Sequence, residues 1–207
     1  MGFKNQTFAK LVTGVTEYRN NMEKNKQEEI AAPHDYIGER LAATRKRLAQ
    51  ERLTYIARVD KAFQTARETW VTGITTRRDK AAALGEANKL DPAKKSPDYA
   101  LLALPTKLEK DELQTLYNRN WADPIFVRAL DDYIEQRNTL PIEHINPFDK
   151  ATISIETILT VFKQYTGTGS NAGGGINDLL LNAVLDDPKQ ELLNQWDEEI
   201  QAAINAI

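Results

Sequence analysis

The sequence of 207 residues contains no cysteine, which excludes disulfides, thiolate metal sites and a cysteine nucleophile. Histidine occurs only twice, as His34 and His144, and neither belongs to a zinc-motif spacing. The three serines lie outside any nucleophile-elbow pattern. We therefore expect no catalytic residue, no metal ion and no cofactor, and a protein that is not an enzyme.

Long apolar runs are also missing. No stretch has the length of a signal-peptide core or of a membrane span, so we expect no membrane partner. The simplest expectation is a soluble intracellular protein, or one that leaves the cell by lysis.

Glycine is scarce, and five of the ten glycines fall within residues 167–175, GTGSNAGGG. Gly169 and Gly174 have the glycine spacing of a phosphate-binding GxxxxGK[ST] loop, but Gly175 and Ile176 replace its lysine and its hydroxyl residue. We predict a flexible hinge at 167–175. Anion binding by backbone amides of a helix starting at Ile176 is the alternative.

Charge is unevenly distributed along the chain. Residues 1–110 hold 21 Lys and Arg against 14 Asp and Glu, a net charge of +7, whereas residues 111–207 hold 6 against 16, a net charge of −10. Such asymmetry suits contact with nucleic acid, self-association or contact between two domains of one chain. Two differently solvated surfaces would give the same pattern.

Apolar residues recur with a period of about 3.6 residues, and no segment alternates with period two long enough to be a strand. The spacing predicts a helix from Thr7 to Ile30, ended by the Ala-Ala-Pro at 31–33. A long proline-free helix follows from Asp35, its N-cap, to about Leu84, with coiled-coil spacing over residues 56–70. We predict an all-α fold in which a long N-terminal helix, hairpin or coiled-coil-like, precedes a smaller acidic helical domain.

The domain boundary is predicted near residue 97. Residues 1–97 form a basic long-helix region with a proline-containing linker from about 85, and residues 98–207 form an acidic compact helical domain. Within the latter we expect short helices at 111–117 and 124–137, with Asp123 capping the second and Pro124 at its first position. Further helices are expected at 151–165, at 176–185 and, amphipathic and opened by Pro188, at 188–207.

The apolar stripes of the long and last helices are candidate protein-binding surfaces. Their residues are Leu48, Tyr55, Val59, Phe63 and Trp70 on the long helix, and Leu193, Trp196, Ile200, Ile204 and Ile207 on the last helix.

Basic residues flank the long stripe, where residues 34–80 hold 11 basic and 6 acidic side chains. Such residues either pair with a helical partner or contact the phosphates of nucleic acid, and both uses stay open. The candidates are Arg40, Arg45, Lys46, Arg47, Arg52, Arg77 and Arg78.

Three stretches carry a resemblance. They are GERLAATRKRLAQERLTYIARVDKAFQTARETW at 38–70, KKSPDYALLAL at 94–104 and FVRALDDYIEQRN at 126–138. Together they resemble small helical proteins encoded among the head and structural genes of tailed bacteriophages. The resemblance spans about half of the chain and includes no catalytic motif. It implies a virion-assembly role, as a scaffold, minor capsid component or capsid-stabilising factor, with other virion proteins or further copies of itself as partners. The implied location is the virion or the host cytoplasm.

Overall fold

The structure is a computed structural model that describes residues 3–167, 181–186, 190–205 and 207, and in these residues it is all-α with no strand. This confirms the predicted fold class. The element order is α1 Gln6–Asp35, α2 Gly38–Asn88, the 3-10 helix η1 Pro92–Lys94, α3 Tyr99–Leu102, α4 Lys110–Asn120, α5 Pro124–Arg137, α6 Pro147–Thr166 and α8 Glu191–Asn205. Residues 181–185 are also helical.

The chain divides into two compact units. Unit 1 combines Met1–Val71 with Ile153–Asn205, and unit 2 is Thr72–Thr152 with residues 206–207. These units do not follow the chain from end to end, because α2 and α6 each contribute residues to both. The domain boundary predicted near residue 97 stays a prediction.

The first helix is longer than the sequence indicated. The Asn5 side chain accepts hydrogen bonds from the backbone N–H groups of Thr7 and Phe8 and so caps the start of α1. The helix then runs through Pro33 to Asp35, so the predicted break at 31–33 is wrong. Pro33 lies in the last turn of α1. The N–H of Tyr36, which follows the helix, donates a hydrogen bond to the carbonyl of Ala32, the residue before Pro33.

The start of the second helix was also predicted wrongly. Asp35 ends α1 instead of capping α2, and Tyr36 and Ile37 form the connection. Gly38 follows with φ of 58°, a left-handed conformation that glycine adopts at little cost. The helix continues to Asn88, so the predicted linker from residue 85 begins inside α2.

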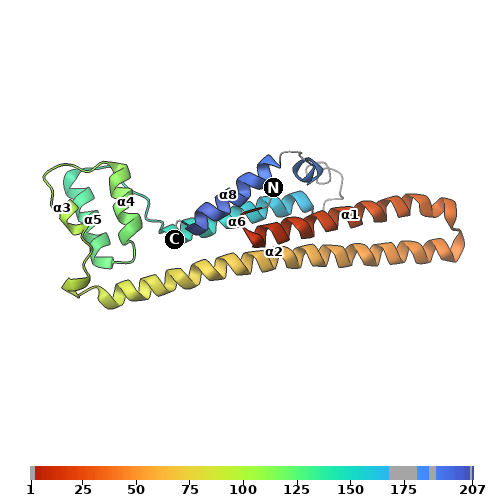
Figure 1. Ribbon diagram of the computed structural model, residues 1–207, viewed down its shortest axis with the longest axis horizontal. Coiled ribbons are helices and arrows are strands. Elements are labelled where there is room, and N and C mark those ends of the chain that lie inside the picture. Colours follow the sequence, from red (N-terminus) through yellow and green to blue (C-terminus); the bar gives the residue numbers. More distant parts are fainter. Residues whose placement is uncertain (1–2, 168–180, 187–189, 206) are drawn as a thin grey trace. The chain divides into compact units, whose positions relative to one another are not determined.

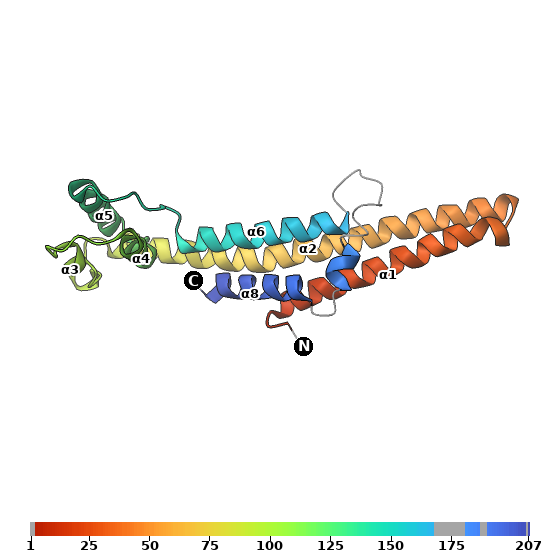
Figure 2. The same ribbon diagram turned by 90° about the horizontal axis from the view of Figure 1, so that it is seen from above.

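Unit 1 is a bundle of α1, the first part of α2, most of α6, and α8. Figures 1 and 2 show α1 and α2 side by side and antiparallel, with α6 and α8 packed along one end of the pair. Rings from all four helices meet in the core. Phe162 of α6 has its ring centroid 6.1 Å from that of Phe8, 5.5 Å from that of Phe63 and 5.3 Å from that of Trp196.

A buried carboxylate joins the last helix to the start of the first. Asp197 of α8 is only 3% exposed, and its two oxygens accept hydrogen bonds from the backbone N–H of Lys4 at 2.6 Å and of Asn5 at 3.0 Å. Because these amides precede α1, Asp197 adds a second acceptor to the cap that the Asn5 side chain provides.

Unit 2 has its own core. Its buried residues are Leu113, Leu116, Tyr117, Phe126, Leu130, Tyr133 and Ile142. The predicted cap at Asp123 is confirmed, since its carboxylate accepts from the N–H groups of Ile125 and Phe126 with Pro124 at the helix start. The helix predicted at 151–165 is part of α6. Of the hinge predicted at 167–175, only Gly167 is described. The alternative anion site at Ile176, the start of the helix predicted at 176–185 and the opening of the last helix at Pro188 lie outside the described residues.

Candidate interaction surface

The long-helix stripe packs inside unit 1. Leu48, Val59, Phe63 and Trp70 are each 5% exposed or less, and Tyr55 is half-buried. The stripe predicted to bind a partner therefore already contacts other helices of the same chain. A partner would reach these side chains only by displacing that packing.

The last helix shows the same outcome. Leu193 and Ile200 are fully buried and Trp196 is 6% exposed, whereas Ile204 and Ile207 are half-buried. The apolar face of α8 helps to close the core of unit 1, which accounts for its amphipathic pattern.

Ion pairs involve three of the seven candidate basic residues. Arg47 contacts Glu28 and Glu51, and Arg52 contacts Glu29. Arg78 contacts Asp79 and Asp149.

The other four basic candidates have no carboxylate partner in the part of the chain that the structure describes. The Arg40 guanidinium lies 5.7 Å from the centroid of the Tyr36 ring. Arg45, Lys46 and Arg77 are exposed, and no ion pair involves them among the described residues. Of the seven candidates, these three are therefore available to an external anion.

The two histidines lie in different units. His34 is in the last turn of α1. His144 lies in unit 2, where Nε2 is 3.3 Å from Asp131 Oδ1 and the ring is 5.2 Å from that of Tyr117. Within the described ranges, no group of three or more His, Cys, Asp or Glu side chains could hold a metal ion.

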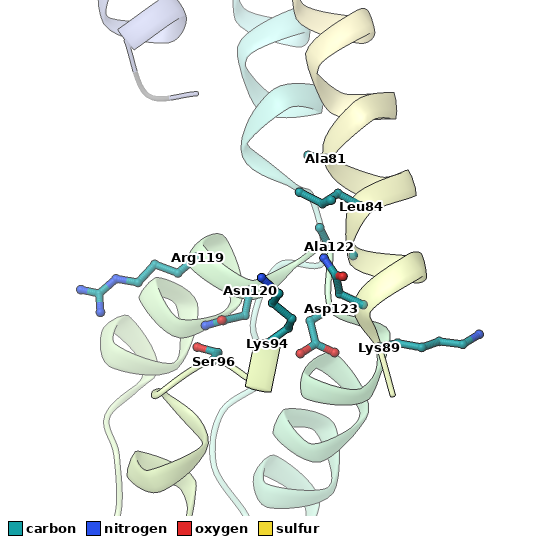
Figure 3. Close-up of a pocket in the computed structure, with 11 residues that line it drawn as sticks. Ala81, Leu84, Lys89, Lys94, Ser96, Arg119, Asn120, Ala122 and Asp123 are labelled. Atoms are coloured by element: carbon teal, nitrogen blue, oxygen red, sulfur yellow. The ribbon is translucent and has the colours of Figure 1, made fainter. Parts of the chain in front are cut away.

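A pocket of about 310 Å³ opens in unit 2 between the end of α2, η1 and the turn before α5 (Figure 3). Lys89 and Arg119 point away from it, whereas the Lys94 side chain runs between Asn120 and Asp123. Asn120, 8% exposed, donates to Asp98 at 2.7 Å and to the carbonyl of Leu116 at 2.9 Å. The polar wall of the pocket therefore consists largely of groups already engaged in local hydrogen bonds.

The Asp123 carboxylate also has a neighbour. The Tyr99 hydroxyl donates to Asp123 Oδ2 at 3.4 Å. Burial, followed by the negative charge of Asp123 and this hydrogen bond, raises the pKa of Tyr99 to about 12. Tyr99 thus stays neutral and a donor at physiological pH, which suits a structural contact with the α5 cap.

The α1–α2 pair extends beyond the helices that cover it. In both views α1 and α2 continue past the ends of α6 and α8 (Figures 1 and 2). Among the described residues, the ion pairs that lie nearest to this extension are those of Arg19 with Asp186, and of Asp60 with Lys163 at 2.9 Å. We call residues 20–35 of α1 and 38–56 of α2 the distal hairpin.

One side of the distal hairpin continues the buried side of the bundle. Seven residues are nearly two helical turns, so residues seven apart point in similar directions. Counting back along α2 in steps of seven, Trp70 and Phe63 are buried and Ile56 is half-buried. The next two residues of the series, Ala49 and Ala42, are exposed.

Larger apolar residues border the same side. Leu53 lies seven residues before Asp60 and is therefore on the same side of α2 as the Lys163 ion pair, yet it is 61% exposed. Ile30 lies three turns after Arg19 and is therefore on the same side of α1 as the Asp186 ion pair, yet it is 65% exposed. We call the side that carries Lys26, Ile30, Ala49, Leu53 and Ile56 the distal face. Of the helices that the structure describes, none packs over it.

The interior of the distal hairpin is unusually polar. Asn25 is 3% exposed, yet its Nδ2 has no hydrogen-bond partner in the described residues, and the same holds for the buried Nε of Arg52. Sequence reasoning missed Asn25 because an asparagine within the polar run at 20–29 indicates exposure. Its place in the 3-4 spacing that begins at Phe8 would have identified it.

Comparison of the chain with protein-family models, with curated proteins and with solved structures gives no match. The geometry of the chain is therefore the basis for a functional assignment. No helix in the described ranges is long and apolar enough to cross a membrane.

Proposed function

We propose that this protein is a non-enzymatic assembly protein that acts through helix–helix contacts made by its distal hairpin. The supporting observation is the distal face, where Leu53 and Ile30 are more than 60% exposed on a side that is buried elsewhere in unit 1. Exposed apolar residues gathered on one side of a helix pair are typical of a protein-binding surface.

A virion component is the partner to test first. The resemblance to small helical proteins from phage head and structural gene regions implies a scaffold, minor capsid or capsid-stabilising role. Such a role needs a stable docking surface and no reaction. The bundle of unit 1 supplies a fixed base for that surface, because the rings of Phe8, Phe63, Phe162 and Trp196 lock its four helices together.

The test is co-purification of the protein with virion components from its native source. We expect Leu53→Glu combined with Ile30→Glu to abolish co-purification, because a carboxylate on each apolar site would have to be buried without a partner. Leu140→Glu is the matched control, since Leu140 is 68% exposed in unit 2. Equal recovery with wild type, the double variant and Leu140→Glu would refute the distal hairpin as the contact.

Nucleic-acid binding is the second candidate. It is favoured by the exposure of Arg45, Lys46 and Arg77 without carboxylate partners among the described residues. Phosphate contacts by Arg45 and Lys46, which both belong to unit 1, predict an affinity for duplex DNA that falls with salt, with a slope of log K against log salt of about −2. A filter-binding titration measures this slope, and no binding at low salt would exclude this candidate.

A further inference from the structure

We propose that the distal face binds the distal face of a second copy of the chain, so that two hairpins related by a two-fold axis form a four-helix bundle. This inference rests on the proposed function, because it assigns the same surface to a second copy of the chain.

The shape of the uncovered region favours a pair of helices as its occupant. At its base the α1–α2 pair is covered by two helices, α6 and α8, and no equivalent pair among the described helices covers the distal hairpin (Figures 1 and 2). A second distal hairpin supplies two antiparallel helices of the same length. Four-helix packing would thereby continue along α1 and α2 without a change in geometry.

The apolar residues of the distal face continue the apolar side of α2 that packs against α6 within the chain. Ile56, Ala49 and Ala42 extend the line of Phe63, whose ring meets Phe162 of α6. Alanine at two successive positions lets another helix approach closely, while Leu53 and Ile30 supply apolar area at the borders.

The charges of the distal hairpin suit self-association. Residues 20–55 hold seven Lys and Arg and six Asp and Glu, so two copies meet with almost no net repulsion. A polyanion would find little net positive charge here.

A two-fold axis also places opposite charges together. Glu23 and Lys26 lie one turn apart on α1, and antiparallel packing of α1 against its copy brings each carboxylate towards the other ammonium. The Glu28–Arg47 ion pair shows which residues of the two helices are level, and it places Ala49 near the level of Lys26. The same axis therefore brings the two Ala49 positions close together.

The first experiment is sedimentation equilibrium of the full chain between 1 and 100 µM. We expect wild type to reach twice its monomer mass of 23.4 kDa, and Ala49→Glu to stay monomeric because the substitution puts two like charges at the axis. Thr54→Glu is the matched control: it is exposed on the same helix, five residues or about 140° further round, and should dimerise as wild type does.

The second experiment uses the absence of cysteine. Ala49→Cys should cross-link between copies with a short bifunctional thiol reagent, whereas Thr54→Cys should not. Circular dichroism of every variant checks that helix content is unchanged.

A wild type that stays monomeric throughout the concentration range would overturn the inference. So would Ala49→Glu dimerising like wild type, or equal cross-linking of the two cysteine variants. Co-purification with virion proteins by a monomeric wild type would sink the self-association alone and leave the proposed function standing. A wild type that dimerises but co-purifies with no virion protein would refute the proposed function and leave the self-association standing.

Discussion

At the scale of single residues, Gly85 occupies a position without room for a side chain. A Cβ built there would lie 1.8 Å from the backbone oxygen of Ala122, so the end of α2 and the turn before α5 approach each other directly within unit 2. Gly73, in the same helix, has no atom within 4 Å of such a Cβ. The two glycines therefore serve different purposes although both lie in α2.

These two positions give a paired prediction. Gly85→Ala should lower the free energy of unfolding by about 1–3 kcal/mol, because backbone must shift to relieve the clash. Gly73→Ala should raise it by about 0.5–1 kcal/mol, because alanine is the better helix former. Urea unfolding followed by circular dichroism measures both. Similar shifts for both variants would contradict the close approach at Gly85.

Tyr99 gives a prediction about pH. Its folded-state pKa of about 12 lies above its ordinary value of 10.0, so the folded state holds the phenol proton more tightly than the unfolded state does. The resulting stability is fully present below pH 10 and is lost as the pH rises towards 12.

An absorbance titration of tyrosinate tests the Tyr99 assignment. The difference between wild type and Tyr99→Phe should show a midpoint close to 12. A midpoint near 10 would mean that Tyr99 is neither buried nor affected by Asp123.

At the scale of elements, α8 is held by one carboxylate that is buried and another that is not. Asp197 accepts two backbone N–H bonds, whereas its neighbour Glu198 pairs with Lys4 at 3.1 Å with both side chains 65% exposed. Adjacent residues on one helix thus separate the effect of a buried hydrogen-bond acceptor from that of a surface ion pair.

We expect Asp197→Ala to destabilise the protein by about 1–3 kcal/mol, because two amides in front of α1 lose their acceptor. Glu198→Ala should change stability by about 0.5 kcal/mol or less, because exposed ion pairs contribute little. Thermal unfolding by calorimetry compares the two. Equal losses would contradict a larger contribution from the buried hydrogen-bond acceptor.

The elements themselves could largely be predicted from the sequence. Periodicity identified α2, α5, α6 and α8, and the Asp123-Pro124 cap was found because its signal is local. The end of α1 could not be predicted, because packing of the 1% exposed Ala32 outweighs the local preference at Pro33. An apolar stripe indicates that a helix face is buried, but not which element buries it. Phe63 and Trp196, predicted to bind a partner, both contact Phe162 of the same chain, and their binding of a partner stays a prediction.

At the scale of the whole molecule, each unit is stabilised by its own core, and that of unit 1 depends on residues distant in sequence. Phe162 is 0% exposed and contacts an aromatic ring from each of the other three bundle helices. The N-terminal and C-terminal parts of unit 1 are therefore expected to unfold together.

Phe162→Ala should cost about 3–5 kcal/mol, because it leaves a cavity where four helices meet. Ile153→Ala, on the same helix at 56% exposure, is the control and should have little effect. Denaturation followed by tryptophan fluorescence measures both losses, because Trp70 and Trp196 belong to unit 1. A small effect of Phe162→Ala would contradict a shared core.

The grouping of Met1–Val71 with Ile153–Asn205 has a consequence for synthesis. The 81 residues of 72–152 must leave the ribosome before α6 and α8 can cover Phe8 and Phe63. At about 5–20 residues per second this interval lasts roughly 4–16 s, far longer than a helix needs to form. The nascent α1 and α2 therefore pass through a period in which their apolar sides are open to chaperones, or to the same segments of neighbouring nascent chains on one messenger.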